Sequence, residues 1–406
     1  MLCFSYGIQL HVPEEYSSIQ LAIDLAYEGD QVLVASGIYY EKIDFKGKNL
    51  SLIGENPENT ILDGFGNNNF NLVTIDSGEK MDATLFKNFT IRGQSSSPQG
   101  RSAFLIGQNS GITLESVRII NNYSPGNAPA IFINSNSYVT VLNSIISNNI
   151  SGSSGGAIYT ENSSLTILNS EISDNNSIQS GGAIRSSNSN ILISNSKIYN
   201  NSTSYSGGAI YLNESELTLE RALFYNNHSE NKGGAIYSKN NSNLLIFKTT
   251  ISNNSSNTNS AGISSKNSNI EILNSIIWPD VITFETADLL DIKYSCISNF
   301  SGLGNIDVNP LFNNVNEADY SLQLISPAID SGDPNSTLDL DGTIIDMGAF
   351  SYSQIKGCMV SDACNYDIYA TIASEDCLFD DCFGDCGGDS ELDECGICNG
   401  NGIPVD

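Results

Sequence analysis

The strongest constraint on the fold is a tetrapeptide, Gly-Gly-Ala-Ile, that occurs four times at a spacing of 26 residues. The copies begin at Gly155, Gly181, Gly207 and Gly233. A fixed period of about 20 to 50 residues is typical of solenoids and propellers, in which one repeat cannot bury its apolar face alone. The repeat therefore predicts a stacked fold in which each tetrapeptide occupies the same place in successive units.

Apolar residues within each unit follow the two-residue period of a strand. One pair recurs per unit: Ile112 and Leu114, Val139 and Val141, Leu165 and Ile167, Ile191 and Ile193, Leu217 and Leu219, Leu244 and Ile246, Ile270 and Ile272. A second column holds Ile146, Ile172, Ile198, Phe224 and Ile251, and the tetrapeptide supplies a third. Three short strands per unit favour a parallel β-helix over a propeller blade, which needs about 40 residues. We predict an all-β, single-stranded parallel β-helix, right-handed because parallel crossovers almost always are.

An amide or acid stands two residues after each member of the second column. These residues are Asn148, Asp174, Asn200, Asn226 and Asn253. Stacked coils lie about 4.8 Å apart, which allows amides at one position to form a ladder along the axis. We therefore expect a ladder on this column, interrupted at Asp174.

The start of the chain predicts a cap for the solenoid. Residues 17–29 are expected to form a short helix, with Ser17 and Gln20 spaced as a capping box and Gly29 placed to end it. A helix here would cover the open sheet edge of the first coil. Residues 1–18 fit two alternatives, the remnant of a signal peptide or an ordinary first strand.

The stretch from Ile19 to Gly64, which begins IQLAIDLAYEGDQVLVASG, resembles the first coils of pectin methylesterases and related right-handed β-helix proteins of the pectin-lyase-like superfamily. The resemblance implies that residues 19–300 form a right-handed β-helix with an N-terminal helical cap. It implies nothing about catalysis, because this part of those esterases is scaffold.

Beyond Trp278 the 26-residue period fades. The stretch from Gly304 to Phe350, with the motifs SPAIDSGDP and DMGAF, resembles the closing segment of secreted bacterial β-helix proteins of the choice-of-anchor type. The resemblance implies that residues 301–356 cap the other end of the β-helix. Within it, Asp339 and Asp341 resemble part of a calcium loop and are weak candidates for a structural calcium, although the closing Glu of an EF-hand is absent. We expect no other cofactor.

Seven cysteines crowd the C-terminal fifty residues. This part resembles two small cysteine-rich modules of surface proteins of marine bacteria, at residues 357–379 and 380–406. The odd number predicts that the second module is truncated and that a partner cysteine lies downstream. Cys382, Cys386, Cys395 and Cys398 could also hold zinc, but the secreted-type resemblance favours disulfides. The disulfide candidates are Cys358, Cys364, Cys377, Cys382, Cys386, Cys395 and Cys398.

Charge and hydropathy exclude several partners. The chain has 17 Lys and Arg against 46 Asp and Glu, a net charge of -29, which repels nucleic acids and anionic lipids. No apolar run reaches the roughly 18 residues that a membrane span needs. We expect a monomeric protein, and the resemblances above imply that it is secreted by a bacterium or held on its surface.

The residue that follows each tetrapeptide forms the main candidate binding site. This column comprises Tyr159, Arg185, Tyr211 and Tyr237, with Phe132 one unit earlier. Pointing outward, it would be an aromatic stripe with one cation, suited to stacking on sugar rings and to recognition of carboxylates. Pointing inward, it would be packing. A Gly-Gly pair can hide a bulge, so alternation leaves both readings open.

The sequence lacks the catalytic motifs of pectin methylesterases and polygalacturonases, and it has only two histidines. We therefore predict a non-enzymatic secreted or cell-surface β-helix that serves adhesion or contact with a polysaccharide or cell-surface glycan. One alternative is a polysaccharide lyase or pectin-esterase-like enzyme acting on acidic polysaccharides. Only two insertions, residues 65–84 and 94–101, could wall a groove for it. The other alternative is a passive structural stalk.

Overall fold

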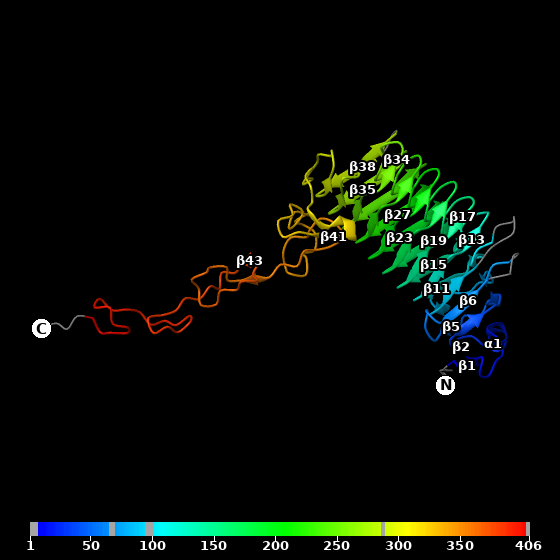
Figure 1. Ribbon diagram of the computed structural model, residues 1–406, viewed down its shortest axis with the longest axis horizontal. Coiled ribbons are helices and arrows are strands. Elements are labelled where there is room, and N and C mark those ends of the chain that lie inside the picture. The colour runs from blue at the N-terminus through cyan, green and yellow to red at the C-terminus, as the bar shows by residue number, and fades with distance from the viewer. Residues whose placement is uncertain (1–6, 65–69, 94–100, 286–288, 403–406) are drawn as a thin grey trace. The chain divides into compact units, whose positions relative to one another are not determined.

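The computed structural model describes residues 7–64, 70–93, 101–285 and 289–402. The chain divides into two compact units, which are described separately. The first comprises Met1–Ser336 and Ile345–Ser351, and the second Thr337–Ile344 and Tyr352–Asp406. In the first unit, parallel strands from successive coils lie side by side in register, so the predicted parallel β-helix is confirmed (Figure 1).

The longest strands form sheet A, which has twelve parallel members. Its strands are β1 (Gln9–Val12), β2 (Gln31–Val34), β5 (Ser51–Gly54), β8 (Leu85–Lys87), β11 (Gly111–Glu115), β15 (Tyr138–Leu142), β19 (Ser164–Leu168), β23 (Asn190–Ser194), β27 (Glu216–Glu220), β31 (Asn243–Phe247), β35 (Asn269–Leu273) and β38 (Leu289–Lys293). Of the two readings of residues 1–18, the described part shows a first strand, β1; residues 1–6 lie outside the described part.

The second strand of each coil belongs to sheet B, which has eleven members. They are β3 (Gly37–Tyr39), β6 (Thr60–Asp63), β9 (Thr90–Arg92), β12 (Arg118–Ile120), β16 (Ile145–Ser147), β20 (Glu171–Ser173), β24 (Lys197–Tyr199), β28 (Leu223–Tyr225), β32 (Thr250–Ser252), β36 (Ile276–Ile277) and β39 (Cys296–Ile297).

Sheet C, which follows the tetrapeptides, has ten members. They are β4 (Ile43–Asp44), β7 (Val73–Ile75), β10 (Phe104–Ile106), β14 (Ile131–Ile133), β18 (Ile158–Glu161), β22 (Ile184–Ser187), β26 (Ile210–Asn213), β30 (Ile236–Lys239), β34 (Ile263–Lys266) and β37 (Ile282–Phe284). Six coils add a fourth, two-residue strand between sheets B and C that the sequence did not predict. This sheet D contains β13 (Tyr123–Ser124), β17 (Ile150–Ser151), β21 (Asn176–Ser177), β25 (Ser202–Thr203), β29 (His228–Ser229) and β33 (Ser255–Ser256).

The core runs along the axis between the sheets. The predicted apolar pairs of sheet A are at most 3% exposed, as Ile191 is, and the second column, which contains Ile172 and Ile198, is fully buried on sheet B. All of these residues belong to one continuous hydrophobic cluster. Each coil thus supplies its apolar side chains to a core that only its neighbours complete, as the repeat predicted.

The tetrapeptide forms the corner that leads into sheet C. Gly181, its first glycine, has φ +69°, a left-handed conformation that side-chain-bearing residues rarely adopt. A Cβ on Gly182, the second, would lie 2.0 Å from the carbonyl oxygen of Gly208 in the next coil. Ala183 and Ile184 are fully buried. The tetrapeptide is therefore a packing device, as predicted, and both glycines are required for different reasons.

An asparagine ladder does run through the coils, but one residue later than predicted. The predicted column, including Asn200, is exposed and adopts positive φ near +55°, so it forms turns. The buried ladder comprises Asn122, Asn149, Asn175, Asn201, Asn227 and Asn254, and it ends at Asp280. The ladder residues are at most 5% exposed, so their polar groups must find partners within the protein.

Asn201 shows the bonding of one rung. Its backbone N and its Nδ2 both donate to Asn227 Oδ1, at 3.1 and 3.0 Å. Its Nδ2 also donates to the carbonyl oxygen of Ile172, at 2.9 Å. In turn, Asn201 Oδ1 accepts from the N and Nδ2 of Asn175. One buried side chain therefore satisfies polar groups in the coils on both sides of it.

The N-terminal end is covered by α1 (Ile19–Leu25), which contacts β1, β2 and β4. The helix is shorter than predicted, and its cap is Ser18 rather than Ser17, since the side chain of Ser18 accepts from Leu21 N. The carboxylate of Glu41, which the sequence did not point to, also accepts from the first two helical N–H groups. Because those N–H groups have no partner inside the helix, Glu41 acts as a second cap.

The closing segment folds back along sheet B in addition to extending the last coil. Ile306 pairs with Cys296, which adds a bridge beyond β39. The hairpin of β40 (Phe312–Asn314) and β41 (Asp319–Leu322), joined through η1 (Val315–Glu317), then packs on the outer face of sheet B. There the ring of Tyr320 lies 5.3 Å from that of Tyr225. Further along, Lys248 Nζ donates to Ser351 Oγ at 2.6 Å.

The second unit contains little regular structure, with β42 (Lys356–Gly357) paired to β43 (Ile372–Ala373). Three disulfides join Cys358 to Cys377, Cys364 to Cys386 and Cys382 to Cys398. Cys395 was a disulfide candidate, but it is free and exposed. The seven cysteines of the tail cannot all pair with one another, which accounts for one being left over. A unit this small buries too little apolar surface to fold without such crosslinks.

The ladder predicts a sharp contrast between adjacent asparagines. Asn201→Ala should lower the free energy of unfolding by about 3 kcal/mol, because it leaves buried N–H and C=O groups in two neighbouring coils without partners. The control is Asn200→Gly, at an exposed position with φ +54° that glycine adopts freely, and it should cost less than about 0.5 kcal/mol. Urea denaturation of both variants measures the difference. Equal losses would contradict the assignment of the ladder to the buried column.

The end of the ladder predicts a pH dependence. Asp280 accepts from Asn254 N and Nδ2, and burial raises its pKa from 3.8 to about 6. The folded state therefore holds this proton more tightly than the unfolded state, and the associated stability is present below pH 4 and lost as the pH rises through 6. Asp280→Asn extends the amide ladder with a side chain that does not titrate. The free energy of unfolding of this variant minus that of the wild type should therefore be about 2 kcal/mol larger at pH 7 than at pH 4. Thermal or urea unfolding of both proteins at the two pH values measures this. A pH-independent difference would refute it.

Candidate functional site

The predicted aromatic stripe lies in register on four neighbouring strands of sheet C. Tyr159, Arg185, Tyr211 and Tyr237 are consecutive Cα partners on β18, β22, β26 and β30. They alternate with the core residues of sheet C, so they lie on its outer face. The guanidinium carbon of Arg185 lies 5.5 Å from the ring centre of Tyr159 and 5.3 Å from that of Tyr211. The residues of the stripe thus pack on one another.

Very little of the stripe is accessible. The exposed fractions of Tyr159, Tyr211 and Tyr237 are 9%, 5% and 8%. Arg185 Nη1 donates to Ser154 Oγ, at 2.8 Å, in the turn that precedes the tetrapeptide of another coil. A sugar ring stacks on a free aromatic face, and these faces are occupied by the neighbouring rings and the guanidinium. The side chains of the stripe therefore pack against one another and are largely inaccessible, although they lie on the outer face of sheet C.

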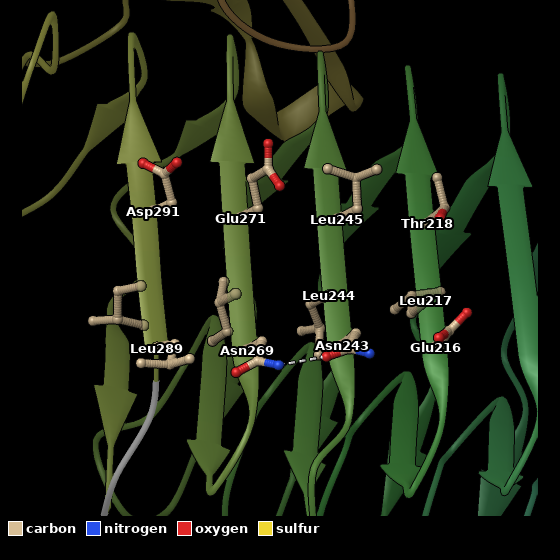
Figure 2. Close-up of a pocket in the computed structure, with 12 residues that line it drawn as sticks. Glu216, Leu217, Thr218, Asn243, Leu244, Leu245, Asn269, Glu271, Leu289 and Asp291 are labelled. Carbon is tan, nitrogen blue, oxygen red and sulfur yellow. Dashed lines mark hydrogen bonds between the residues drawn. The ribbon is translucent and has the colours of Figure 1, made fainter.

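A groove on the outer face of sheet A is lined by acidic and apolar side chains (Figure 2). Glu216, Asn243, Asn269 and Leu289 form one row across neighbouring strands, and Thr218, Leu245, Glu271 and Asp291 form a second row. Asp291 makes an ion pair with Lys293, whereas no ion pair among the described residues includes Glu216 or Glu271. The groove has the wrong charge for an acidic polysaccharide.

A second groove, of about 540 Å³, lies at the corner between sheets C and A and is entirely uncharged. We call it the polar groove, and it spans three coils. Its lining is Ser135, Asn136, Tyr138, Asn162, Ser163, Ser164, Asn188, Ser189 and Asn190. Tyr138, at one end of the polar groove, is 50% exposed. Amides, hydroxyls and one accessible aromatic ring are the groups that pair with the hydroxyls and the apolar faces of sugars.

The polar groove has a rigid base. Ser137 N donates to Ser163 Oγ and Ser163 N donates to Ser189 Oγ, both at 3.1 Å, so buried serines form a second ladder at this corner. On the surface above it, Asn188 Nδ2 donates to Asn162 Oδ1 at 2.6 Å. Asn162 and Asn188 have φ near +48°. Sequence analysis missed this groove, although an Asn-Ser pair recurs there at the 26-residue spacing.

The two calcium candidates lie in the second unit, and neither belongs to a group of three potential metal ligands among the described residues. Asp341 accepts from Thr343 N and Oγ1 and from Gln354 N. Burial alone would raise the pKa of Asp341, but these hydrogen bonds outweigh burial and lower it. Among the described residues, only Cys364, Asp380 and Cys386 come close enough together to hold an ion, and the two cysteines form a disulfide. The calcium assignment therefore stays a prediction.

Comparison with known proteins identifies the family. A sequence model described as the right handed beta helix region matches residues 63–229 and 129–284, which together cover more than half of the chain. The chain belongs to this right-handed β-helix family. The match confirms the predicted handedness, and it ends before the closing segment and the cysteine-rich tail.

Comparisons with curated proteins and with solved structures gave the following results. A search of curated proteins found no match to this chain. Among solved structures, the crystal structure of pectate lyase Pel9A is similar, with a TM-score of 0.46 and 15% identity over 86% of this chain and 97% of that chain. A similarity with so low a sequence identity and TM-score gives no information about activity. In the part of the chain that the structure describes, no helix is long and apolar enough to cross a membrane.

The buried stripe generates a test that separates packing from binding. Tyr211→Ala should lower the free energy of unfolding by about 3 kcal/mol, because it removes a ring packed between Arg185 and Tyr237. Tyr211→Phe, which keeps the ring, should be nearly neutral. Neither variant should change binding to any polysaccharide at a temperature where it is folded. A folded Tyr211→Phe protein with weakened binding would return the stripe to the binding site.

Proposed function

We propose that this protein is a secreted or cell-surface β-helix that contacts a polysaccharide through the polar groove and does not cleave it. The observation that carries the proposal is the groove itself, an uncharged surface of amides and hydroxyls across three coils with the half-exposed ring of Tyr138. A linear sugar chain is suited to it, because neighbouring coils repeat the same side-chain types about 4.8 Å apart.

Extracellular placement is supported by the second unit. Three disulfides within about forty residues are typical of an oxidising compartment. Attachment to a bacterial surface through the closing segment and the cysteine-rich modules belongs to the same proposal. The net charge of -29 supports partners other than nucleic acids and anionic membranes.

Two tyrosine substitutions, one inside and one outside the polar groove, test the binding surface. Tyr138→Ala should weaken binding of the best ligand in a polysaccharide panel about tenfold, because one stacking contact is worth about 1.4 kcal/mol. Tyr205→Ala is the matched control, since Tyr205 is 54% exposed but lies outside the polar groove. Affinity electrophoresis or calorimetry gives the two affinities.

Two outcomes would contradict the proposal. Equal affinities of the two variants would move the binding surface away from the polar groove. A wild-type protein that binds no member of a broad panel of neutral and acidic polysaccharides would favour the passive stalk.

The acidic groove of sheet A favours a different enzymatic alternative from a lyase or esterase on acidic polysaccharides, namely hydrolysis of a neutral polysaccharide. Glycoside hydrolysis uses two carboxylates that face one bond, and Glu271 and Asp291 are adjacent in register on β35 and β38. Incubation with the same panel, read for new reducing ends, unsaturated uronate and methanol, should give no product. Product formed by the wild type and abolished in Glu271→Gln would replace the non-enzymatic proposal with hydrolysis in this groove.

A further inference from the structure

A half-open pocket of about 410 Å³ lies on the outer face of sheet C, over β10 and β14. We call it the Arg101 pocket. It is lined by Asn71, Arg101, Ser102, Leu105, Gly126, Asn127, Phe132 and Asn134, and it shares no residue with either groove described above. Leu105 and Phe132 precede Tyr159 in the same outward column, on β10, β14 and β18.

Arg101 makes no ion pair with any residue that the structure describes, and its pocket is lined by uncharged residues apart from Arg101 itself. Its Nε is buried and has no hydrogen-bond partner among the described residues. None of the residues lining the pocket is acidic, although the chain has 46 acidic residues against 17 basic ones. A partly buried cation without a counter-charge is costly. An external anion in the pocket would remove that cost.

The other polar groups of the pocket can serve as donors to such an anion. Asn71 Oδ1 already accepts from Ser102 N at 3.0 Å, and Asn127 Oδ1 accepts from Ser154 N at 3.1 Å. Each amide oxygen has used one of its two lone pairs in this way, and each amide also has an NH2 group, which can donate twice. Together with the fork of the guanidinium, the pocket presents donors in excess of acceptors, which matches an oxyanion.

The apolar part of the lining indicates what carries the oxyanion. The ring of Phe132 lies 5.4 Å from that of Tyr159, which fixes its position, and Leu105 lies beside it in register. An aromatic face next to hydrogen-bond donors suits the apolar face of a sugar ring. The volume is that of a site for a small ligand.

We propose that the Arg101 pocket binds the oxyanion of an anionic sugar residue, a carboxylate or a sulfate. The pocket would recognise acidic sugar residues, in addition to the contact that the polar groove makes with a glycan. This proposal rests on the proposed function only in taking the ligand to be a sugar. Sequence analysis pointed to the insertions at residues 65–84 and 94–101 as walls of a groove. Their described parts supply Asn71 and Arg101, whereas residues 65–69 and 94–100 lie outside the described part.

Calorimetric titration of the full chain with single sugars tests the proposal. Glucuronate represents the carboxylate, glucose 6-sulfate the sulfate, and glucose the neutral sugar; acetate and inorganic sulfate represent the bare ions. The wild type should bind at least one anionic sugar and should bind glucose at least tenfold more weakly. Arg101→Gln should weaken the anionic sugar at least tenfold. Arg118→Gln, which removes the same charge from sheet B, should leave the affinity unchanged.

The proposal would be overturned if the wild type bound neither anionic sugar, or if Arg101→Gln bound the anionic sugar as tightly as the wild type does. Binding of acetate or sulfate as tight as that of the sugars would also overturn it, because the pocket would then be a site for an ion only. If Arg101→Gln does not fold, Asn134→Ala, at a partly exposed position, should weaken the same ligand about threefold, and an unchanged affinity would again refute the proposal. Tyr138→Ala should not alter these affinities, so failure of the polar groove and failure of the pocket are distinguishable.

Discussion

The rest of the structure depends on the buried asparagine ladder. One side chain per coil accepts from the preceding coil and donates to the following one, so each coil is held at a fixed height and register relative to its neighbours. The ladder tolerates coils of different length, since Asn201 and Asn227 are 26 residues apart, whereas Asn227 and Asn254 are 27 apart. The extra residue is absorbed outside the ladder. Because the amide cannot be satisfied by water at this depth, a coil that slipped would leave several buried polar groups unpaired.

A fixed register turns each sequence position into a column on the surface, and the columns differ in chemistry. Sheet A carries acidic residues such as Glu216 and Glu271 beside exposed leucines, and the corner between sheets C and A carries asparagine, serine and one open tyrosine. Arg101 lies on the outer face of sheet C, in a pocket whose described lining contains no acidic residue. Function is therefore assigned to particular faces of a uniform scaffold. The neutral corner and the cationic pocket can both face a glycan that the acidic sheet would repel when it is charged.

The sequence predicted the β-helix, its inward columns and the packing role of the tetrapeptide because these follow from periodicity. It placed the ladder one residue too early, because asparagine occupies both neighbouring positions in most coils. Asp174 was a clue, since it interrupts the exposed column while the next residue, Asn175, continues an unbroken one. The stripe was found in sequence, but its burial depends on neighbouring turns such as that of Ser154, which contacts Arg185. The pocket could not be predicted, since its residues come from several coils.

Native-state hydrogen exchange tests the central claim, that buried asparagines hold the coils together. The backbone N–H groups of Asn175, Asn201 and Asn227 each donate to the side-chain oxygen of the next asparagine in the ladder. We predict that these amides exchange only when the surrounding coils unfold, with the same free energy as core amides of sheet A. Exchange as fast as that of amides in exposed turns would contradict the account, because it would show that the ladder opens while the coils stay folded.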